Sequence, residues 1–194
     1  MQFPKQFFIT GTDTDVGKTY VSAFLMRALH YDYWKPIQTG TAVSSDTIWM
    51  KQKTKLPEGR FEKEAYRFAA PLSPHAAAER ENTVIDLAKI QLPKRARLIV
   101  EGAGGVLVPI NGEALMIDLI KQLAIPVVVV AKSGLGTINH TLLTLNVLRQ
   151  MGVSIVGVVC NDPTNLCNLK SLQYYGNTDV VTLEELRSTY LAPL

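Results

Sequence analysis

Residues 7–19 read Phe-Phe-Ile-Thr-Gly-Thr-Asp-Thr-Asp-Val-Gly-Lys-Thr, an apolar run followed by a loop that ends in Gly17-Lys18-Thr19. A helical pattern follows, from Lys18 to His30. Backbone N–H groups of such a loop can bind phosphate at the start of a helix, while the lysine reaches the outer phosphates and the threonine hydroxyl meets Mg²⁺. The strict pattern needs glycine where this chain has Thr12, so the loop is a variant. An ordinary strand-to-helix turn is the alternative.

The rest of the chain repeats this alternation of apolar run and helical pattern. Continuous apolar runs are typical of strands that are covered on both faces, as in a parallel sheet. The runs cover Phe7–Thr10, Tyr31–Pro36, Leu98–Glu101, Pro126–Ala131 and Ser154–Asn161. Helical patterns cover Lys18–His30, Val84–Gln91, Ala114–Leu123 and Thr137–Met151, and a reduced strand at Val180-Val181 precedes a short helix at Leu183–Tyr190. We therefore predict an α/β fold with a mainly parallel sheet and helices on both faces.

Length and composition favour one globular domain. The chain has 194 residues, 47% hydrophobic and 19% charged, which fits a single globular domain. Together with the loop at 11–19, we predict one P-loop NTPase-like domain over 1–194. Two cysteines, with three histidines, form no disulfide framework or zinc pattern, and we expect a reducing, cytoplasmic setting. We expect no membrane-spanning helix.

The net charge of +3 does not indicate a nucleic-acid partner, and we expect none. Basic residues do gather in two stretches. We interpret both as solvated faces: Lys51, Lys53, Lys55, Arg60 and Lys63 in one, Lys94, Arg95 and Arg97 in the other.

Three further charged residues are candidates for a site beside the loop. Ligands of such sheets lie outside the carboxyl ends of the strands. Glu101 ends a buried run there and could hold Mg²⁺, or could simply cap a turn. Lys35 ends the second run and could bind phosphoryl or carboxyl charge, or lie on the surface. Asp46 is a weaker metal candidate, with helix capping as the alternative, in the irregular segment Thr39–Asn82.

Six ordered motifs between residues 7 and 162 resemble those of the dethiobiotin synthetase family. They are Gly11–Thr19, Lys35–Gly40, Ser73-Pro74-His75, Val100–Gly105, Gly136–His140 and Asn161-Asp162. The resemblance implies an ATP- and Mg²⁺-dependent reaction in biotin synthesis, in which 7,8-diaminononanoate and CO₂ give dethiobiotin, ADP and phosphate. It also implies a carbamate and a carbamic-phosphoric anhydride as intermediates, and a homodimer that shares the substrate site.

The resemblance also implies roles for individual residues. Catalytic roles fall to Lys18, Lys35, Thr14 and Asp15, and metal binding to Thr19, Asp46 and Glu101. Nucleotide binding falls to Asp13, Thr14, Asp15, Val16, Gly17, Lys18, Thr19, Tyr20, Glu101 and Asn161. Substrate binding falls to Thr39, Gly104, Gly136, Thr137, Ile138 and Asn139, the last four at a helix N-terminus that suits a carboxylate.

The chain departs from the family after Asn161. The part from about residue 163 is divergent and short, without the family's Gly-x-Ile-Pro type loop that closes over the base, so CTP or GTP could replace ATP. Two other functions stay open on the residues alone. A P-loop switch or partitioning ATPase shares the fold, although such proteins carry a lysine where this chain has Asp13. The related amidotransferase synthetases need a glutaminase domain for which the sequence has no room.

Overall fold

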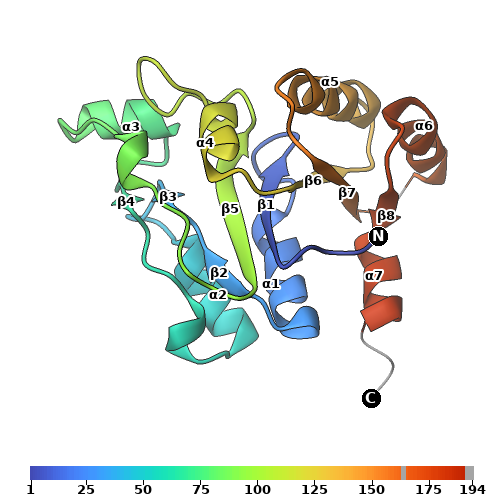
Figure 1. The fold of residues 1–194 in the computed structure, drawn as a ribbon, viewed down its shortest axis with the longest axis horizontal. Helices are drawn as coiled ribbons and strands as arrows, with labels where there is room; N and C mark the ends of the chain where they lie inside the picture. The colour runs from blue at the N-terminus through green and yellow to red at the C-terminus, as the bar shows by residue number, and fades with distance from the viewer. Residues whose placement is uncertain (163–164, 191–194) are drawn as a thin grey trace.

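The computed structural model describes residues 1–162 and 165–190. Figure 1 shows a central sheet with helices above and below it. The strands of the main sheet lie in the order β2-β5-β1-β6-β7-β8, and every neighbouring pair is parallel. Their bounds are β1 Gln6–Gly11, β2 Asp32–Trp34, β5 Leu98–Gly105, β6 Val127–Lys132, β7 Ile155–Asp162 and β8 Val180–Thr182. The predicted α/β fold with a mainly parallel sheet is confirmed.

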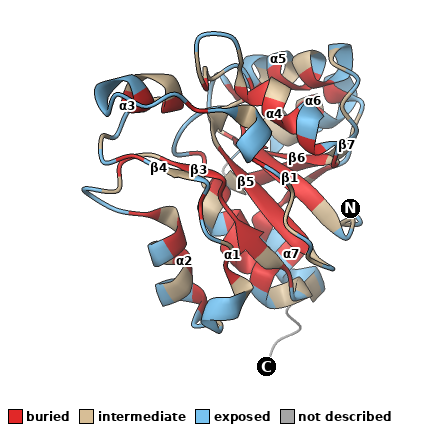
Figure 2. Cartoon of the chain, turned by 60° about the vertical axis from the view of Figure 1, so that its left-hand side comes forward, coloured by how far each residue is buried: buried red, intermediate tan, exposed pale blue. Residues whose placement is uncertain are grey.

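Helices cover both faces of this sheet, which explains the continuous apolar runs. One core cluster joins the sheet to α1 (Lys18–Leu29), α2 (Asp46–Thr54) and α7 (Leu183–Tyr190). The other joins it to α3 (Pro74–Arg80), α4 (Met116–Leu123), α5 (Thr137–Gln150) and α6 (Leu166–Gly176). In Figure 2 the buried residues concentrate in the strands between these two layers.

The register of the strands brings the candidate loops to one edge. Ile9 of β1 lies opposite Glu101 of β5, and Gly11 lies opposite both Gly105 of β5 and Val130 of β6. The phosphate loop therefore begins between the carboxyl ends of two neighbouring strands. This is the position at which open α/β sheets bind ligands.

Several local predictions were wrong. The run Tyr31–Pro36 is not one strand: β2 ends at Trp34, and after Pro36 the chain leaves the sheet to pair β3 (Ile37–Gln38) with β4 (Tyr66–Arg67). Proline lacks the N–H that a ladder needs. The predicted helix Val84–Gln91 is only a 3₁₀ turn, η2 (Leu87–Lys89), which Asp86 caps with its side chain. A second 3₁₀ turn, η1 (Glu58–Arg60), and the helices α2, α3 and α6 were not predicted.

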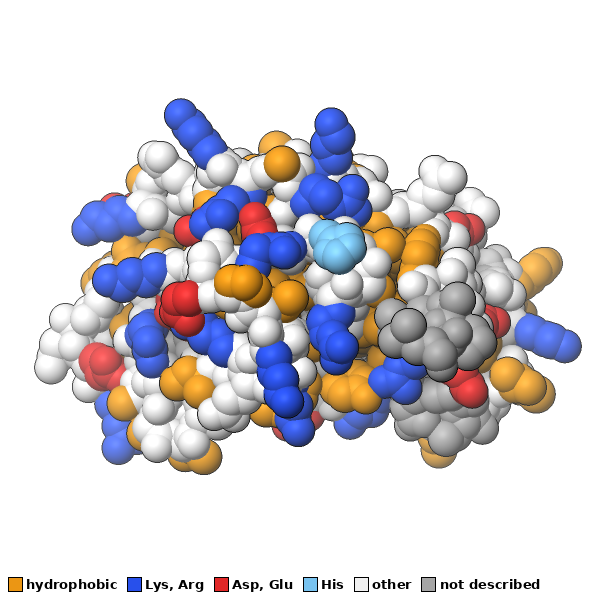
Figure 3. Space-filling view, turned by 90° about the horizontal axis from the view of Figure 1, so that it is seen from below, with side chains coloured by type: hydrophobic (Ala, Val, Ile, Leu, Met, Phe, Trp, Pro, Cys, Tyr) orange, Lys and Arg blue, Asp and Glu red, His pale blue; other side chains and the backbone are white. Residues whose placement is uncertain are grey.

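The two basic stretches are partly solvated, as predicted. Lys53, Lys55, Lys63 and Lys94 are exposed. The arginines are half-buried and also hold local contacts: Arg60 and Arg95 both pair with Asp32, Arg95 also pairs with Glu62, and Arg97 lies 4.2 Å from the centre of the Tyr31 ring. In the view of Figure 3, basic side chains are interleaved with acidic and apolar ones.

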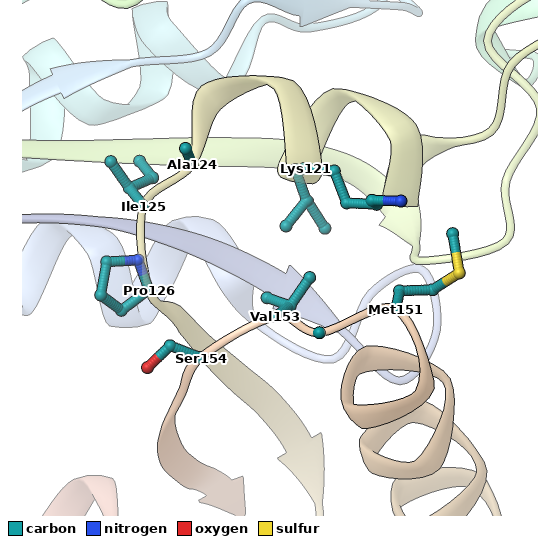
Figure 4. Close-up of a pocket in the computed structure, with 9 residues that line it drawn as sticks. Lys121, Ala124, Ile125, Pro126, Met151, Val153 and Ser154 are labelled. Atoms are coloured by element: carbon teal, nitrogen blue, oxygen red, sulfur yellow. The ribbon is translucent and has the colours of Figure 1, made fainter.

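A shallow groove opens at the opposite end of β6 and β7 from the phosphate loop. Figure 4 shows it between the end of α4 and the turn that follows α5. Its volume is about 310 Å³, and its lining is mostly apolar, including Ile125, Pro126, Met151 and Val153. It brings together no set of charged groups, and the chemistry must be sought at the other edge.

Candidate functional site

The loop between β1 and α1 is tightly wound. Gly17 has a φ of 94° and Asp15 a φ of 55°, both in the left-handed region. Gly17 is the N-cap of α1, and no side chain bonds the first N–H groups of the helix. A Cβ at Gly11 would come 2.7 Å from the Asp13 carbonyl oxygen, so the loop folds back on its own start. Open N–H groups at a helix N-terminus are the donors that bind phosphate.

Lys18 lies inside this loop. Its side-chain nitrogen donates a hydrogen bond to the Asp13 carbonyl oxygen at 3.0 Å, and the residue is 7% exposed. Burial lowers the pKa of Lys18, and the nearby charge of Lys35 lowers it further, against a smaller opposing effect of Glu101. The fold therefore disfavours the protonated form that an anionic ligand would stabilise.

Glu101 is the centre of the polar contacts at this edge. Its side chain is fully buried, and Oε1 accepts hydrogen bonds from the Thr19 hydroxyl at 2.7 Å and from the Lys35 amine at 3.2 Å. Oε2 lies 2.8 Å from the Ser22 hydroxyl, whose single proton can instead go to the Lys18 carbonyl at 2.9 Å. A fully buried carboxylate is costly without such partners. The turn-capping alternative is not what the structure shows.

Lys35 joins Glu101 to Asp46. It forms an ion pair with each of the two carboxylates, and its side chain is 6% exposed. Burial alone would lower the pKa of Lys35, but Glu101 and Asp46 outweigh it and raise the pKa. Asp46 begins α2, and its N–H donates to the Gln38 side chain at 3.0 Å. The sequence indicated Asp46 only as a weak metal candidate, yet in the fold Asp46 pairs with Lys35, the same side chain that pairs with Glu101.

The remaining loop candidates differ in their burial. Asp13, Thr14 and Asp15 are exposed, and the Thr14 N–H donates to the Asp13 carboxylate at 2.7 Å. Val16 is buried in the apolar core, and Tyr20 is 45% exposed. The outer part of the predicted loop therefore faces solvent.

Two candidates from other strands frame the loop. The Asn161 amide donates to the Val16 carbonyl at 3.4 Å, and a Cβ on Gly17 would come 2.1 Å from its nitrogen. Gly104 has a φ of 71°, and a Cβ there would lie 2.6 Å from Val108. Thr39 follows β3 and is half-buried, with its carbonyl accepting from Gln38 at 2.7 Å. The side chain of Asp162 lies outside the described residues.

The predicted carboxylate site lies in the next loop along the sheet. Gly136 is the N-cap of α5 with a φ of 90°, and no side-chain cap bond is present among the described residues, while the Thr137 N–H donates to the Gly134 carbonyl at 3.2 Å. Thr137 donates instead to the Lys132 carbonyl, Ile138 is half-buried, and Asn139 is exposed. The structure shows no contact between these four residues and Lys18, Lys35 or Glu101 within the described part of the chain.

Sequence reasoning missed Ser22, Tyr33 and Gln38. Ser22 follows Lys18 by four residues and Thr19 by three, so a helical projection could have placed it beside them. Tyr33 precedes Lys35 by two residues, the spacing that puts two side chains on one face of a strand. No pattern in the sequence singled out Gln38, whose role depends on the turn into α2.

The donors at this edge fit magnesium with a nucleotide. Mg²⁺ prefers one or two carboxylates, hydroxyl oxygens and substrate phosphates. Glu101, Asp46 and Thr19 offer oxygens of this kind, joined through Lys35 and through the hydrogen bond of Thr19 to Glu101. The described residues contain no cluster of three or more His, Cys, Asp or Glu side chains that could hold a metal by themselves. A Mg²⁺ ion bound jointly by these protein oxygens and by phosphate oxygens of a nucleotide would fit both the donors present and the lack of a cluster in the described residues that could hold a metal alone.

Comparisons with known proteins agree with the geometry. A family model described as an AAA domain matches residues 5–186. The chain is 52% identical to an ATP-dependent dethiobiotin synthetase BioD of Paramagnetospirillum magneticum, over 90% of this chain and 84% of the relative. It is 47% identical to the protein of the same name from Lawsonia intracellularis, over 95% and 89%.

A third relative with this name, from Novosphingobium aromaticivorans, is 48% identical over 78% of this chain and 74% of its own length. None of the helices in the described ranges 1–162 and 165–190 is both long and apolar enough to span a bilayer. The phosphate loop, its parallel sheet and these long alignments lead to one conclusion: the chain belongs to the ATP-dependent dethiobiotin synthetase family of P-loop proteins.

Proposed function

We propose that this chain catalyses the ATP- and Mg²⁺-dependent closure of 7,8-diaminononanoate with CO₂ to dethiobiotin, ADP and phosphate. One observation carries the proposal: two lysines and a fully buried glutamate meet at the phosphate loop, with Lys35 3.2 Å from Glu101. Burying charges costs stability even when they are paired, and clusters of this kind concentrate at functional sites. The relatives named for this reaction align over most of the chain.

The reaction needs charge to be neutralised at two moments. CO₂ adds to one amine, which loses a proton, to give a carbamate. The carbamate oxygen then attacks the γ-phosphate and expels ADP, which forms the carbamic-phosphoric anhydride. The second amine then attacks the carbamoyl carbon, loses a proton and expels phosphate. Phosphoryl transfer depends mainly on positioning and charge stabilisation. Lys18 and Lys35 supply fixed positive charge, and the N–H groups of the loop orient the phosphates.

We assign the other residues to roles around these two lysines. Thr19, Asp46 and Glu101 hold Mg²⁺, which neutralises charge on the nucleotide phosphates when bound. Nucleotide contacts fall to the loop 13–20 together with Glu101 and Asn161. Thr14, Asp15, Thr39 and Gly104 line the side on which the carbamate and phosphate react.

We also propose that a second copy of the chain completes the site. Gly136–Asn139 lie at the start of α5, where a helix N-terminus suits a carboxylate, but within the described residues they contact none of Lys18, Lys35 and Glu101. Leu135, Asn139 and Leu143 follow one another at helical spacing, and the two leucines are 106% and 57% exposed. Exposed apolar residues beside a polar site are typical of protein interfaces. A homodimer would cover them and bring one copy's α5 to the other's phosphate loop.

The direct experiment measures dethiobiotin made by the purified protein from ATP, Mg²⁺, bicarbonate and 7,8-diaminononanoate. We expect product only when all four components are present, and repeating the assay with CTP and GTP tests whether the divergent part from about residue 163 changes the choice of nucleotide. A Lys18→Ala variant serves as the matched control and should lose activity. Folded protein that binds nucleotide but makes no dethiobiotin would overturn the proposal. ATP hydrolysis that DNA or membranes stimulate would then favour a switch ATPase.

The dimer has a separate test. Sedimentation should give twice the mass of the chain, and Leu135→Asp with Leu143→Asp should give the mass of one copy. The variant should keep nucleotide binding while the KM for the diamine rises. A wild-type protein that sediments as one copy and still makes dethiobiotin would contradict the shared site.

A further inference from the structure

The hydroxyl of Tyr33 is buried and makes no hydrogen bond of regular geometry, although it lies near Glu101. Tyr33 is 0% exposed, and its Oη is one of a few buried side-chain atoms in the described residues that lack a well-formed hydrogen bond. Its neighbour Tyr31 is equally buried, but the Tyr31 hydroxyl donates to the Pro4 carbonyl at 2.6 Å. Leaving a buried hydroxyl unpaired is unfavourable, so each such group in a folded protein calls for an explanation.

Strand geometry places Tyr33 next to the ion cluster. Tyr33 lies opposite Ile99 in the parallel pair β2 and β5. Glu101 follows Ile99 by two residues in β5, so the side chains of Tyr33, Ile99 and Glu101 occupy the same face of the sheet. Lys35 lies just beyond the end of β2, and its side chain meets Glu101 there. Two residues of strand span about 6.6 Å, a distance that a tyrosine side chain can reach. Burial raises the pKa of Tyr33 well above its ordinary value, and the charges of Glu101 and then Asp46 raise it further, as does the approach of the hydroxyl to the Glu101 carboxylate. The hydroxyl therefore already faces Glu101 but does not yet form a regular hydrogen bond with it.

The contacts of Glu101 must change when a metal ion binds. In the structure, Oε1 accepts from Thr19 and from Lys35, while Oε2 is near Ser22. A cation held by Thr19 and Glu101 would take a lone pair of the threonine oxygen, which keeps its proton, and would repel the positive charge of Lys35. Glu101 would then lose Lys35 as a donor while it stays inside a dry core. Charge-assisted hydrogen bonds from neighbouring donors are the usual compensation.

We propose that Tyr33 is a positioning residue for Glu101, with its hydroxyl donating to this carboxylate when Mg²⁺ and nucleotide are bound. This inference rests on the proposed function only through metal and nucleotide binding, and it needs no turnover. The unpaired hydroxyl is then a donor that becomes satisfied in the bound state. Tyr33 acts through Glu101 and does not touch the reacting atoms.

Two single-atom deletions separate this role from a packing role. Tyr33→Phe removes the unpaired hydroxyl and keeps the ring. Tyr31→Phe, the matched control, removes a satisfied hydroxyl from the same core cluster. Urea unfolding without ligands measures stability, and electron paramagnetic resonance measures the Kd of Mn²⁺ in the presence of ADP.

The two variants should behave in opposite ways. We expect Tyr33→Phe to unfold at the same urea concentration as the wild type or a higher one, and to weaken Mn²⁺ binding about tenfold, since a hydrogen bond to a charged group has about this effect. ADP binding without metal should not change. Tyr31→Phe should unfold at lower urea and bind Mn²⁺ as the wild type does.

A Tyr33→Phe protein that binds Mn²⁺ within twofold of the wild type overturns the inference, whatever its stability. Equal weakening of Mn²⁺ binding in Tyr31→Phe also overturns it, because the effect then comes from general loosening of the core. Failure of the proposed function gives a different result: the wild type binds Mn²⁺ and ADP, Tyr33→Phe weakens this binding, and neither protein makes dethiobiotin.

Discussion

The two edges of the sheet hold charged groups in different ways. At the carboxyl edge, the side chains of Glu101 and Lys35 are 0% and 6% exposed, and they meet inside the core. At the amino edge, Asp32 begins β2 and pairs with Arg60 and Arg95, whose side chains are 27% and 33% exposed. Similar ion pairs thus lie in a dry environment at one edge and near water at the other.

This difference indicates what each group of charges is for. Ion pairs near water contribute little, while buried ones are costly to form and also costly to break on one side. A fold gains little stability by burying Lys18, Lys35 and Glu101 together. We infer that the carboxyl edge retains them for the ligand, and that the amino edge uses its pairs only to hold neighbouring segments.

The sharpest test removes the centre of the buried cluster. Glu101→Ala leaves Lys35 with Asp46 alone and takes an acceptor from Thr19 and Ser22. We expect the free energy of unfolding to fall by about 3–5 kcal/mol in urea titrations, as for other broken buried pairs. Dethiobiotin formation should be lost as well. Glu58→Ala, which breaks an exposed ion pair, is the control. If Glu101→Ala lowers the free energy of unfolding no more than Glu58→Ala does, the distinction between the two edges is wrong.

The two buried lysines should respond in opposite directions. The pKa of Lys18 lies below its ordinary value of 10.5, so burying its charge costs stability at neutral pH, and this cost disappears as the pH rises toward 10.5. The pKa of Lys35 is raised, so its contribution is full below 10.5 and is lost as the pH rises through the raised value.

Lys18→Met should therefore leave stability unchanged or raise it at pH 7, and Lys35→Met should lower it. Both should reduce product formation roughly 100- to 1,000-fold, as the loss of an electrostatic group does. Thermal unfolding over a pH series, with single-turnover assays beside it, separates the two effects. If both variants lose stability equally at pH 7, the assignment of opposite electrostatic environments is wrong.

The sequence predicted the parts of this site that follow directly from strand ends. Glu101 and Lys35 end apolar runs, and parallel strands bring such ends to one edge. Asp46 was placed only weakly, because its position depends on Gln38 and the turn into α2 rather than on a strand. The unpaired hydroxyl of Tyr33 could not be foreseen, since burial of one atom depends on packing between β2, α2 and Phe61.

The helices were likewise predicted only where the sequence has a clear local pattern. Helices with strong apolar spacing, such as α5, were predicted, whereas α6 was not, and it lies in the part from residue 163 that we took as divergent. The helical pattern at 84–91 failed because the Asp86 side chain bonds the Ala88 N–H at 2.9 Å and closes a tight turn. Local side-chain bonds of this kind compete with a helix.

A smaller effect is expected at the amino edge. Asp32→Asn removes the charge that Arg60 and Arg95 share, although Arg95 keeps Glu62. Because these groups are partly solvated, the free energy of unfolding should fall by about 1 kcal/mol, with product formation unchanged. Urea titrations at low and high salt measure this, and a loss of activity would show that the two edges are coupled.

The smallest effect belongs to the pair between Lys51 and Glu58. Their side chains are 33% and 80% exposed, so water and salt screen the attraction. Lys51→Ala should change the free energy of unfolding by less than about 1 kcal/mol, and 1 M salt should remove most of that change. The ammonium group also lies 5.7 Å from the centre of the Phe61 ring. Lys51→Arg keeps the charge and is the matched control. Packing of a side-chain stem on an aromatic surface is not screened by ions. A loss of stability that occurs only in Lys51→Ala and does not depend on salt would therefore come from packing on the Phe61 ring.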